Sequence, residues 1–442
     1  MSILGMVLLS YVIGAAAMFF DLPTSGVLGK AFIGGRSWNE RRRATAATGP
    51  RELSPLATGQ RDDPAKSFDG FTLYALYTCA DVPPWGNQAF LIDMNRQLVH
   101  HWAMPFSDVW PNPPHIRDRV DDKFMCFFGC HLYANGDLLV VYQGTHDTTG
   151  GLAKLDVESN VVWKYSAGVH HDVDVGEDGT IYAIEHEVVH EMPAGLEFVP
   201  TPCLVDSLVL LSPAGEPLAK PLPILEAFRD SSYALHLSPL ARPPTRSSQA
   251  NDAPAKAAVA PRWDDDGQVH DPMHTNSVKV LGRELARRFP GFEPGQVLIS
   301  IRNLDTIAVV DLEKRQVVWA ARGPWQAQHD AHFLESGHLL IFDNRGLPVR
   351  SRVLEYDPRT QAFPWTYSGE NAGPFYTRER GMSQRLPNGN TLIVNSENGE
   401  MIEVTENKVV VWTCSTGRYI STARRYAAEQ VHFLKEGQRA RP

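Results

Sequence analysis

The chain has 442 residues, of which 43% are hydrophobic and 21% are charged, and its formal net charge is −9. This composition is that of a globular protein with a large apolar core, and it excludes a disordered or fibrous chain. The negative charge and the lack of any basic stretch interleaved with aromatic residues argue against nucleic-acid binding.

The chain opens with an uncharged apolar segment from Ile3 to Phe20, closed by Asp21. Its length is near the lower limit for a membrane-spanning helix and is long for the core of a signal peptide. We therefore expect residues 1–22 to be a transmembrane anchor or a signal segment, with a buried helix as the alternative. Basic residues follow the segment and none precede it, a bias that would keep the rest of the chain in the cytoplasm.

Residues 23–66 are interpreted as a linker. Between Arg41 and Lys66 the sequence is rich in Arg, Ala, Thr, Gly and Pro and has no apolar periodicity. The remainder, residues 67–442, is dominated by short strand patterns, and we interpret it as one large domain.

Two short patterns alternate from Phe71 onward. The first is an apolar pair, an acidic residue, a turn and a β-branched run that ends in tryptophan, and a divergent copy at Val209 to Pro217 lacks the tryptophan. The complete copies end at Trp102, Trp163, Trp319, Trp365 and Trp412. The second pattern is a hairpin with glycine at its turn, as in HLYANGDLLVVY and HFLESGHLLIF.

These alternating patterns make about six similar four-stranded units, none of which could bury its faces alone. We therefore predict an all-β fold, a six-bladed β-propeller. The tryptophan is expected to pack between neighbouring blades. The widest interval between repeats lies between Ser212 and Asp311, which predicts an insertion at about residues 222–262. It starts with an amphipathic helical stretch at Leu222 to Leu240, followed by a Pro/Ala/Ser-rich segment at Ala241 to Pro261.

Five cysteines are too few for a disulfide-dense scaffold. Cys126 and Cys130 are close in sequence and form either a local disulfide or two buried thiols. A metal site there is not expected, because no second close cysteine pair completes a ligand set.

Histidines recur at one position of the hairpin pattern. Counting back eight residues from Gly337, Gly179 and Gly282 gives, in that order, His329, His171 and His274. The two remaining copies place Phe128 and Gly381 there. Equivalent positions of a propeller lie at the same height around its axis, so we expect the three histidines to converge on one pocket. The alternative is that they are ordinary core or surface histidines.

A rival constellation is His186-Glu187-Val188-Val189-His190, which matches the H-E-x-x-H pattern of zinc proteases. That chemistry requires a helix, on which both imidazoles share one face. Here the segment continues a predicted strand and no third ligand is evident. We therefore predict no metal.

Three histidines, an asparagine and an arginine in a water-accessible funnel, with Arg302 just beyond the strand at QVLISIRN, match neither a Ser-His-Asp set nor a pair of glycosidase carboxylates. Histidine can itself be a covalent nucleophile. Arginine and imidazole are suitable donors to the oxygens of a transferred sulfuryl or phosphoryl group. This combination favours group transfer over hydrolysis by a serine or a carboxylate.

Four stretches of the sequence resemble those of a known family. They are HHDVDVGEDGTIYAIEHE, HTNSVKVL, QHDAHFLESGHLLIFDNRG and RLPNGNTLIVNSENGEMIEV. From Phe71 to Gly417 the chain resembles the arylsulfotransferase (arylsulfate sulfotransferase) family. The resemblance implies a six-bladed propeller that moves a sulfuryl group from an aryl sulfate to a phenolic acceptor through a sulfohistidine. It also implies a periplasmic location, in the inner membrane if the anchor is kept, against the charge bias of the N-terminal segment.

Carried over by motif, the resemblance makes His329 the nucleophile. His274, His171 and Arg302 would complete the catalytic set, and Asn276 would bind substrate. His170 and His332 are adjacent second choices for substrate binding. The chain has no room for the extra N-terminal β-rich domain of the larger bacterial members, which leaves its oligomeric state and its acceptor open.

No Gly-rich nucleotide-binding loop is present, so no cofactor is predicted and a nucleotide sulfate donor is disfavoured. The expected partners are a small aryl sulfate donor, a phenolic or other hydroxyl acceptor, and a membrane through the N-terminal segment. Two alternatives stay open. One is a sulfate-ester hydrolase that uses the same pocket, and the other is a non-catalytic, membrane-tethered propeller that acts as a binding module.

Overall fold

The computed structural model describes residues 63–77, 87–116, 121–144, 149–241, 269–346, 350–370, 373 and 375–434. The apolar segment at residues 3–20, most of the predicted linker and residues 242–262 of the predicted insertion lie outside these ranges. None of the helices within the described ranges is long and apolar enough to span a bilayer. The chain divides into two compact units, and the larger one contains every described strand.

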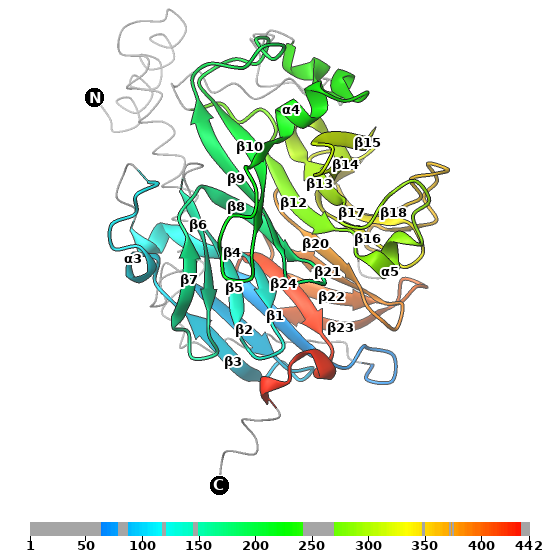
Figure 1. Ribbon diagram of the computed structural model, residues 1–442. Helices are drawn as coiled ribbons and strands as arrows, with labels where there is room; N and C mark the ends of the chain where they lie inside the picture. Colours follow the sequence, from blue (N-terminus) through cyan, green and yellow to red (C-terminus); the bar gives the residue numbers. More distant parts are fainter. Residues whose placement is uncertain are drawn as a thin grey trace, which may run out of the picture. The chain divides into compact units, whose positions relative to one another are not determined.

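The prediction of an all-β, six-bladed propeller is confirmed. The strands form six four-stranded antiparallel sheets (Figure 1). In order from the axis outward, the first three blades are β24 (Ile420–Tyr426), β1 (Phe71–Leu76), β2 (Gln88–Ile92) and β3 (Leu98–Ala103); β4 (Met125–Leu132), β5 (Leu138–Gly144), β6 (Gly150–Leu155) and β7 (Val161–Tyr165); and β8 (Val169–Val175), β9 (Ile181–Val189), β10 (Cys203–Leu211) and β11 (Leu222–Pro223).

The other three blades follow the same order. They are β12 (Thr275–Val280), β13 (Val297–Ile301), β14 (Thr306–Asp311) and β15 (Gln316–Arg322); β16 (His329–Phe333), β17 (Leu339–Gly346), β18 (Arg350–Tyr356) and β19 (Trp365–Tyr367); and β20 (Met382–Arg385), β21 (Thr391–Asn395), β22 (Glu400–Val404) and β23 (Val410–Ser415). The inner strands contact one another in the cyclic order β24, β4, β8, β12, β16, β20, which defines the axis of the propeller.

Short helices connect or cover the blades. They are α3 (Phe106–Val109), η1 (Asp122–Phe124), α4 (Ile224–Arg229), η2 (Ala234–Ala241), α5 (Arg283–Ala286), η3 (Arg302–Leu304) and η4 (Ala428–Gln430). The helical stretch predicted at Leu222 to Leu240 is therefore present as α4 and η2, with the two-residue strand β11 before them.

Three of the six second strands are buried along their whole length. β5, for example, reads LLVVYQG and is buried along its whole length, because its two faces pack against the neighbouring sheets. Such a strand carries a continuous apolar run rather than an alternating one. The same is true of β13 and β21, so the core of the protein lies between the blades.

The repeated tryptophans lie between blades, as the sequence predicted, and most of them also form a hydrogen bond across that boundary. The indole N–H of Trp102 donates to the Gly136 carbonyl of the next blade, at 3.1 Å. Trp163, Trp365 and Trp412 donate in the same way to carbonyl oxygens of the following blade. The indole is thus both a large apolar filler and a donor that fixes the neighbouring turn.

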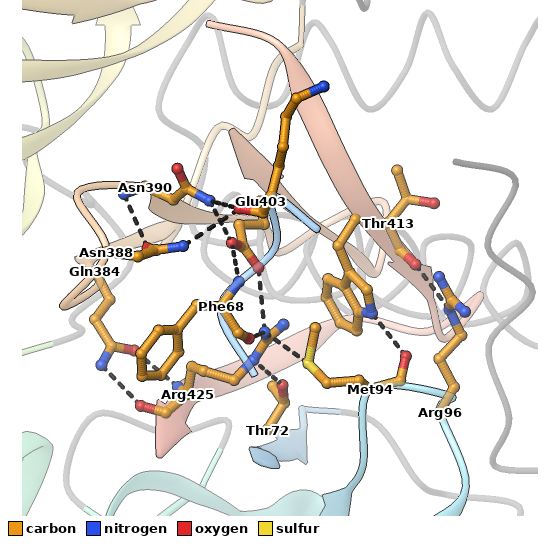
Figure 2. Close-up of polar contacts among 12 residues, drawn as sticks. Phe68, Thr72, Met94, Arg96, Gln384, Asn388, Asn390, Glu403, Thr413 and Arg425 are labelled. Carbon is orange, nitrogen blue, oxygen red and sulfur yellow. Dashed lines mark hydrogen bonds and ion pairs between the residues drawn. The ribbon is translucent and has the colours of Figure 1, made fainter. Parts of the chain in front are cut away.

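The ring is closed by strands from the two ends of the domain, since β24 pairs with β1 (Figure 1). Figure 2 shows the polar network at this closure, in which Arg425 of β24 donates to Glu403 of β22 at 3.2 Å and to Thr72 of β1 at 2.6 Å. The Glu403 carboxylate also accepts from the Phe68 N–H and from the Asn390 side chain, each at 2.7 Å. Both members of this ion pair are fully buried.

Four of the five cysteines are described, and all four are free, buried thiols. Cys126 and Cys130 are therefore two thiols rather than a disulfide. Burial raises the pKa of Cys126 to about 12, so this thiol stays protonated and behaves as a small apolar side chain.

Candidate functional site

All six inner strands contribute to one pocket on the axis of the propeller. Its lining residues are Phe128, Gly129, His171, Asp172, Asn276, His329, Asp330, Arg380, Gly381, Met382, Ser421, Thr422 and Arg424. Two of the three histidines that the repeat frame singled out, His171 and His329, therefore line the same pocket. The third, His274, packs its ring against that of His171, with centroids 4.8 Å apart. The structure thus places two of the three histidines in the pocket and the third against one of them.

β-Bulges in two of the inner strands orient these side chains. The register shifts between His170 and Val173 in β8 and between His329 and His332 in β16. His171 and His274 have positive φ angles of 60° and 53°. Non-glycine residues in this region are strained and concentrate at functional sites. A regular strand would have sent alternate side chains into the blade interfaces instead.

The spacing rule that located the histidines, eight residues before a turn glycine, holds for only two of the three. Gly179 and Gly337 are hairpin turn residues with φ angles of 82° and 81°. Gly282 has a φ of −66° and is the N-cap of α5, so it is not an equivalent turn residue. His274 nevertheless reaches the site, because β12 starts beside β8.

His329 is held in one tautomer. Its Nδ1 faces two acceptors, the Ala327 carbonyl at 3.0 Å and Asn344 Oδ1 at 2.8 Å. The amide orientation of Asn344 is fixed, since its Nδ2 donates to the carbonyls of Thr377 and Arg380. The proton of His329 therefore sits on Nδ1, and Nε2 carries the lone pair.

The Nε2 atom of His329 accepts a long hydrogen bond of 3.3 Å from the Arg380 backbone N–H. Burial, and next the positive charge of Arg302, lower the pKa of His329 to about 3, against an ordinary value of 6.5. The imidazole is thus neutral at neutral pH. A neutral imidazole whose Nε2 lone pair is released from this long hydrogen bond is the form that can attack an electrophile.

We predict that His329 stays neutral, with its proton on Nδ1, between about pH 5 and 8. Because the unfolded chain binds a proton on this residue below its ordinary pKa of 6.5 while the folded chain does not, folding stability from this group falls as the pH drops from 6.5 toward about 3. Long-range ¹⁵N–¹H correlation spectra of the wild type and the His329→Ala variant check the tautomer. Titration of the His329 signals near pH 6.5 would contradict the prediction.

His274 is paired with a carboxylate. Asp271 accepts from the His274 backbone N–H at 2.9 Å and from its ring Nδ1 at 2.5 Å. The carboxylate's burial would raise its pKa, but the neighbouring His274 lowers it, and the net pKa lies below the ordinary value. The pair therefore fixes the proton of His274 on Nδ1 and leaves Nε2 as the nitrogen that can exchange a proton.

Two arginines bring positive charge to the site. Arg302 follows β13 and is close enough to His329 to lower its pKa electrostatically. Arg380 stacks on the Phe128 ring at 3.0 Å and donates through Nη1 to the Ser421 carbonyl at 2.9 Å. Its Nη2 is buried and has no hydrogen-bond partner among the described residues. A donor of this kind suits the oxygen of a bound anion.

Asn276 lines the pocket, but its amide N–H donates to the Gln328 carbonyl at 2.8 Å. Its Oδ1 is buried with no partner in the described part of the chain. The side chain therefore holds the residue before His329 and offers the pocket an acceptor rather than a donor.

The two second choices do not line the pocket. The Nε2 atom of His170 lies 3.4 Å from Asp206 Oδ1, inside the third blade. The Nε2 atom of His332 pairs with Asp330 at 2.8 Å, farther along β16. Neither is among the residues that line the pocket.

Sequence reasoning missed Asp271, Asn344 and Arg380. Asp271 stands three residues before His274 in HDPMHTN, a spacing that could have suggested the pair. Arg380 directly precedes Gly381, the position to which the repeat frame pointed. Asn344 lies fifteen residues after His329, and no local pattern links the two.

The H-E-x-x-H segment is not helical, as the sequence predicted. His186 lies in β9 (Ile181–Val189) and His190 follows that strand. Residues four apart in a strand are separated by about 13 Å, which is too far for both imidazoles to bind one ion. A zinc-protease site is thus excluded for this segment.

A family model described as Arylsulfotransferase (ASST) matches residues 130–417, more than half of the chain. No curated protein matches the chain significantly. Solved structures with a similar fold include a protein of unknown function from Bacteroides caccae, with 10% identity and a TM-score of 0.49 over 81% of this chain and 99% of that one.

Two further similar structures are a streptogramin B lyase and the WD40 β-propeller domain of Doa1. The lyase has 10% identity and a TM-score of 0.40, over 83% of this chain and 89% of that one. The Doa1 domain has 11% identity and a TM-score of 0.39, over 81% of this chain and 87% of that one. At these levels the structures carry no functional information.

Proposed function

The chain belongs to the arylsulfotransferase family, and we propose that it moves a sulfuryl group from a phenolic sulfate ester to a phenolic or other hydroxyl acceptor through His329. The observation that carries this proposal is the state of His329, a buried neutral imidazole whose Nδ1 proton is fixed by Asn344. It lies in a pocket that also holds the partner-free Nη2 of Arg380.

In the first step the Nε2 lone pair of His329 forms a bond to sulfur, and the bond between sulfur and the aryl oxygen breaks. The aryl oxygen leaves with the electron pair of that bond. Arg302 and Arg380 would neutralise the sulfuryl oxygens, whose charge has to be stabilised where water is largely excluded. The product is a sulfohistidine at His329, with its positive charge reduced by the Nδ1–H donated to Asn344.

The leaving phenolate requires a proton, and His274 is suited to supply it. Asp271 holds its Nδ1–H at 2.5 Å, so that a protonated His274 can give up the Nε2 proton and return to the neutral form. His171, in ring contact with His274 and in the pocket lining, would orient the oxygen at which this transfer occurs.

The second step reverses the first with a new phenol. The acceptor hydroxyl attacks sulfur, its proton passes to Nε2 of His274, and the bond between sulfur and Nε2 of His329 breaks. His329 recovers its lone pair and its neutral Nδ1–H form. The Oδ1 of Asn276, which has no partner among the described residues, would accept from an incoming hydroxyl, a role that its oxygen suits better than contact with a sulfate.

The test is a donor–acceptor assay with the full chain. We expect 4-nitrophenyl sulfate to release nitrophenol rapidly only when a phenol is added, and the sulfate to appear on that phenol. Two-substrate kinetics should give the parallel-line pattern of a ping-pong mechanism. Release of free sulfate at the same rate with and without acceptor would instead establish the hydrolase alternative.

Asp271→Asn is expected to lower kcat by about 100- to 10,000-fold, because an amide can stabilise the wrong tautomer of His274. The loss should be larger for donors whose phenol is weakly acidic than for 4-nitrophenyl sulfate, since a good leaving group needs less protonation. A matched control is Asp178→Asn, on an exposed turn, which should retain full activity. Equal losses across the series of donors would contradict the proposed role of the His274–Asp271 pair.

A further inference from the structure

Behind the pocket, three potential metal ligands gather on adjacent strands of the third blade. They are His170 on β8, His186 on β9 and Asp206 on β10. His186 and Asp206 are direct partners in the antiparallel register, and their neighbour His170 stacks on the His186 ring, with centroids 4.3 Å apart. One ligand atom from each residue lies within 4.8 Å of the others.

His170 and Asp206 are buried and His186 is half-buried, and the polar atoms of the cluster are incompletely satisfied. His170 is 2% exposed and Asp206 is 1% exposed. The Nε2 atoms of His170 and His186 are both buried, and neither has a hydrogen-bond partner among the described residues. Buried polar atoms are rarely left unpaired in a native protein, so each such atom requires an explanation. Two unpaired imidazole nitrogens in one cluster with a carboxylate are a stronger signal than either alone.

The two oxygens of the Asp206 carboxylate have different neighbours. Its Oδ2 accepts from the Thr275 backbone N–H at 2.8 Å, which joins the third and fourth blades. Its Oδ1 faces His170 Nε2 at 3.4 Å without forming a hydrogen bond. In a tetrahedral zinc site with bonds of about 2.0–2.1 Å, neighbouring ligand atoms lie about 3.3 Å apart. The observed separation of 3.4 Å between His170 Nε2 and Asp206 Oδ1 is close to this value.

We propose that His170, His186 and Asp206 bind a divalent transition-metal ion of the Zn²⁺ type. Two imidazole nitrogens and one carboxylate oxygen are ligands that Zn²⁺ prefers, and three protein ligands leave its fourth position for a water molecule. The planes of the His170 and His186 rings are 23° apart, so the two rings are stacked. Metal binding requires the His186 ring to rotate out of this stack. This site is distinct from the H-E-x-x-H pairing, because His190 takes no part in it.

The site is connected to the catalytic pocket through one hydrogen bond. Nδ1 of His170 lies 2.6 Å from Nδ1 of His171. A neutral His170 that binds an ion through Nε2 must carry its proton on Nδ1, so His171 then accepts at its own Nδ1. His171 consequently carries its proton on Nε2 and becomes a donor. His170 would thus be a positioning residue, a role that rests on the sulfotransferase function proposed above.

The test measures metal directly, without a sulfate ester. The full chain, produced without a polyhistidine tag and stripped with a chelator, is titrated with Zn²⁺ and separately with Co²⁺. We expect one equivalent to bind, with the d–d absorption of a Co²⁺ ion in a low-symmetry nitrogen–oxygen site. Failure of the wild type to bind either ion would overturn the proposal, whatever the enzymatic activity.

Variants assign the ligands. His186→Ala and Asp206→Asn should each weaken binding by more than about a hundredfold, because even outer-shell changes cost about 10- to 100-fold. The control His190→Ala, an exposed residue of the same segment, and His329→Ala should bind as the wild type does. Unchanged affinity in both ligand variants would refute the assignment. Circular dichroism is used to check whether the variants fold. If they do not fold, the wild-type titration and its Co²⁺ spectrum alone test whether the protein binds the metal.

The link to His171 has its own readout. In ¹⁵N–¹H spectra, metal binding should shift His171 from a mixture of its Nδ1–H and Nε2–H tautomers to the Nε2–H tautomer alone. This change should be absent in the Asp206→Asn variant. A metal that binds while the His171 tautomer stays unchanged would refute the coupling to the pocket. An inactive enzyme that still binds metal and shows the tautomer change would refute the sulfotransferase proposal alone.

Discussion

Replacing His329 with alanine is expected to abolish sulfuryl transfer, with a loss of at least about a thousandfold in kcat/KM. The reason is that no other described imidazole has its proton fixed on Nδ1 by a side-chain amide and its Nε2 in the axial pocket. A donor labelled with ³⁵S, rapidly quenched in alkali and digested, should place the label on the peptide that contains His329. Sulfohistidine is acid-labile, so alkaline quenching is essential to this measurement.

Two controls separate a chemical from a structural effect. His190→Ala changes an exposed histidine outside the pocket and should leave turnover unchanged. Asn344→Ala keeps the nucleophile but removes the acceptor that fixes its tautomer, so kcat should fall while labelling of His329 persists at a slower rate. Full turnover by His329→Ala, or label recovered on His171 or His274 instead, would refute the assignment of the nucleophile.

Glu403→Ala is expected to destabilise the folded protein by about 3–5 kcal/mol, because it leaves the Arg425 charge buried without its counter-ion. Figure 2 shows why the cost is high: the same carboxylate accepts from the Phe68 N–H and the Asn390 side chain, which would also lose their partner. Both charged groups have no exposed side-chain surface. The variant should therefore unfold at a clearly lower urea concentration than the wild type.

The matched control is Arg287→Ala. Its ion pair with Glu284 is 71% and 72% exposed, and exposed pairs contribute about 0–1 kcal/mol. Glu403→Gln removes the charge but keeps an oxygen acceptor, so we expect an intermediate loss. If Glu403→Ala and Arg287→Ala shifted the urea midpoint equally, the closure network would not be the stabilising feature that its burial implies.

Much of the fold was predictable because it repeats. Each blade contains a tryptophan or a turn glycine at a fixed place, and one weak local pattern becomes reliable when it recurs about six times. The role of the tryptophans as fillers between blades followed from their size and spacing. Their hydrogen bonds did not, since the Gly136 carbonyl that Trp102 contacts belongs to a different blade.

The candidate site was predictable only in part. His171, His274 and His329 were found by counting within the repeat, which works because equivalent positions of a propeller face one axis. His170 is next to His171 and His332 lies three residues after His329, and residues an odd number of positions apart in a regular strand point to opposite faces. In β8 the register shifts between His170 and Val173. His170 lies beside Asp206 inside the third blade, whereas His171 lines the pocket.

The sequence by itself determined the propeller, the number of its blades and three histidines at its axis, because these depend on local patterns that recur along the chain. Only the tertiary structure decided the charge and proton state of those histidines. The partners that set them, Asn344 for His329 and Asp271 for His274, come from a return strand and from the loop before a strand. Only the fold also brings His170, His186 and Asp206 together, because three strands of one blade place them side by side. A pKa, a tautomer and a metal site are properties of surroundings that a chain creates only when it folds.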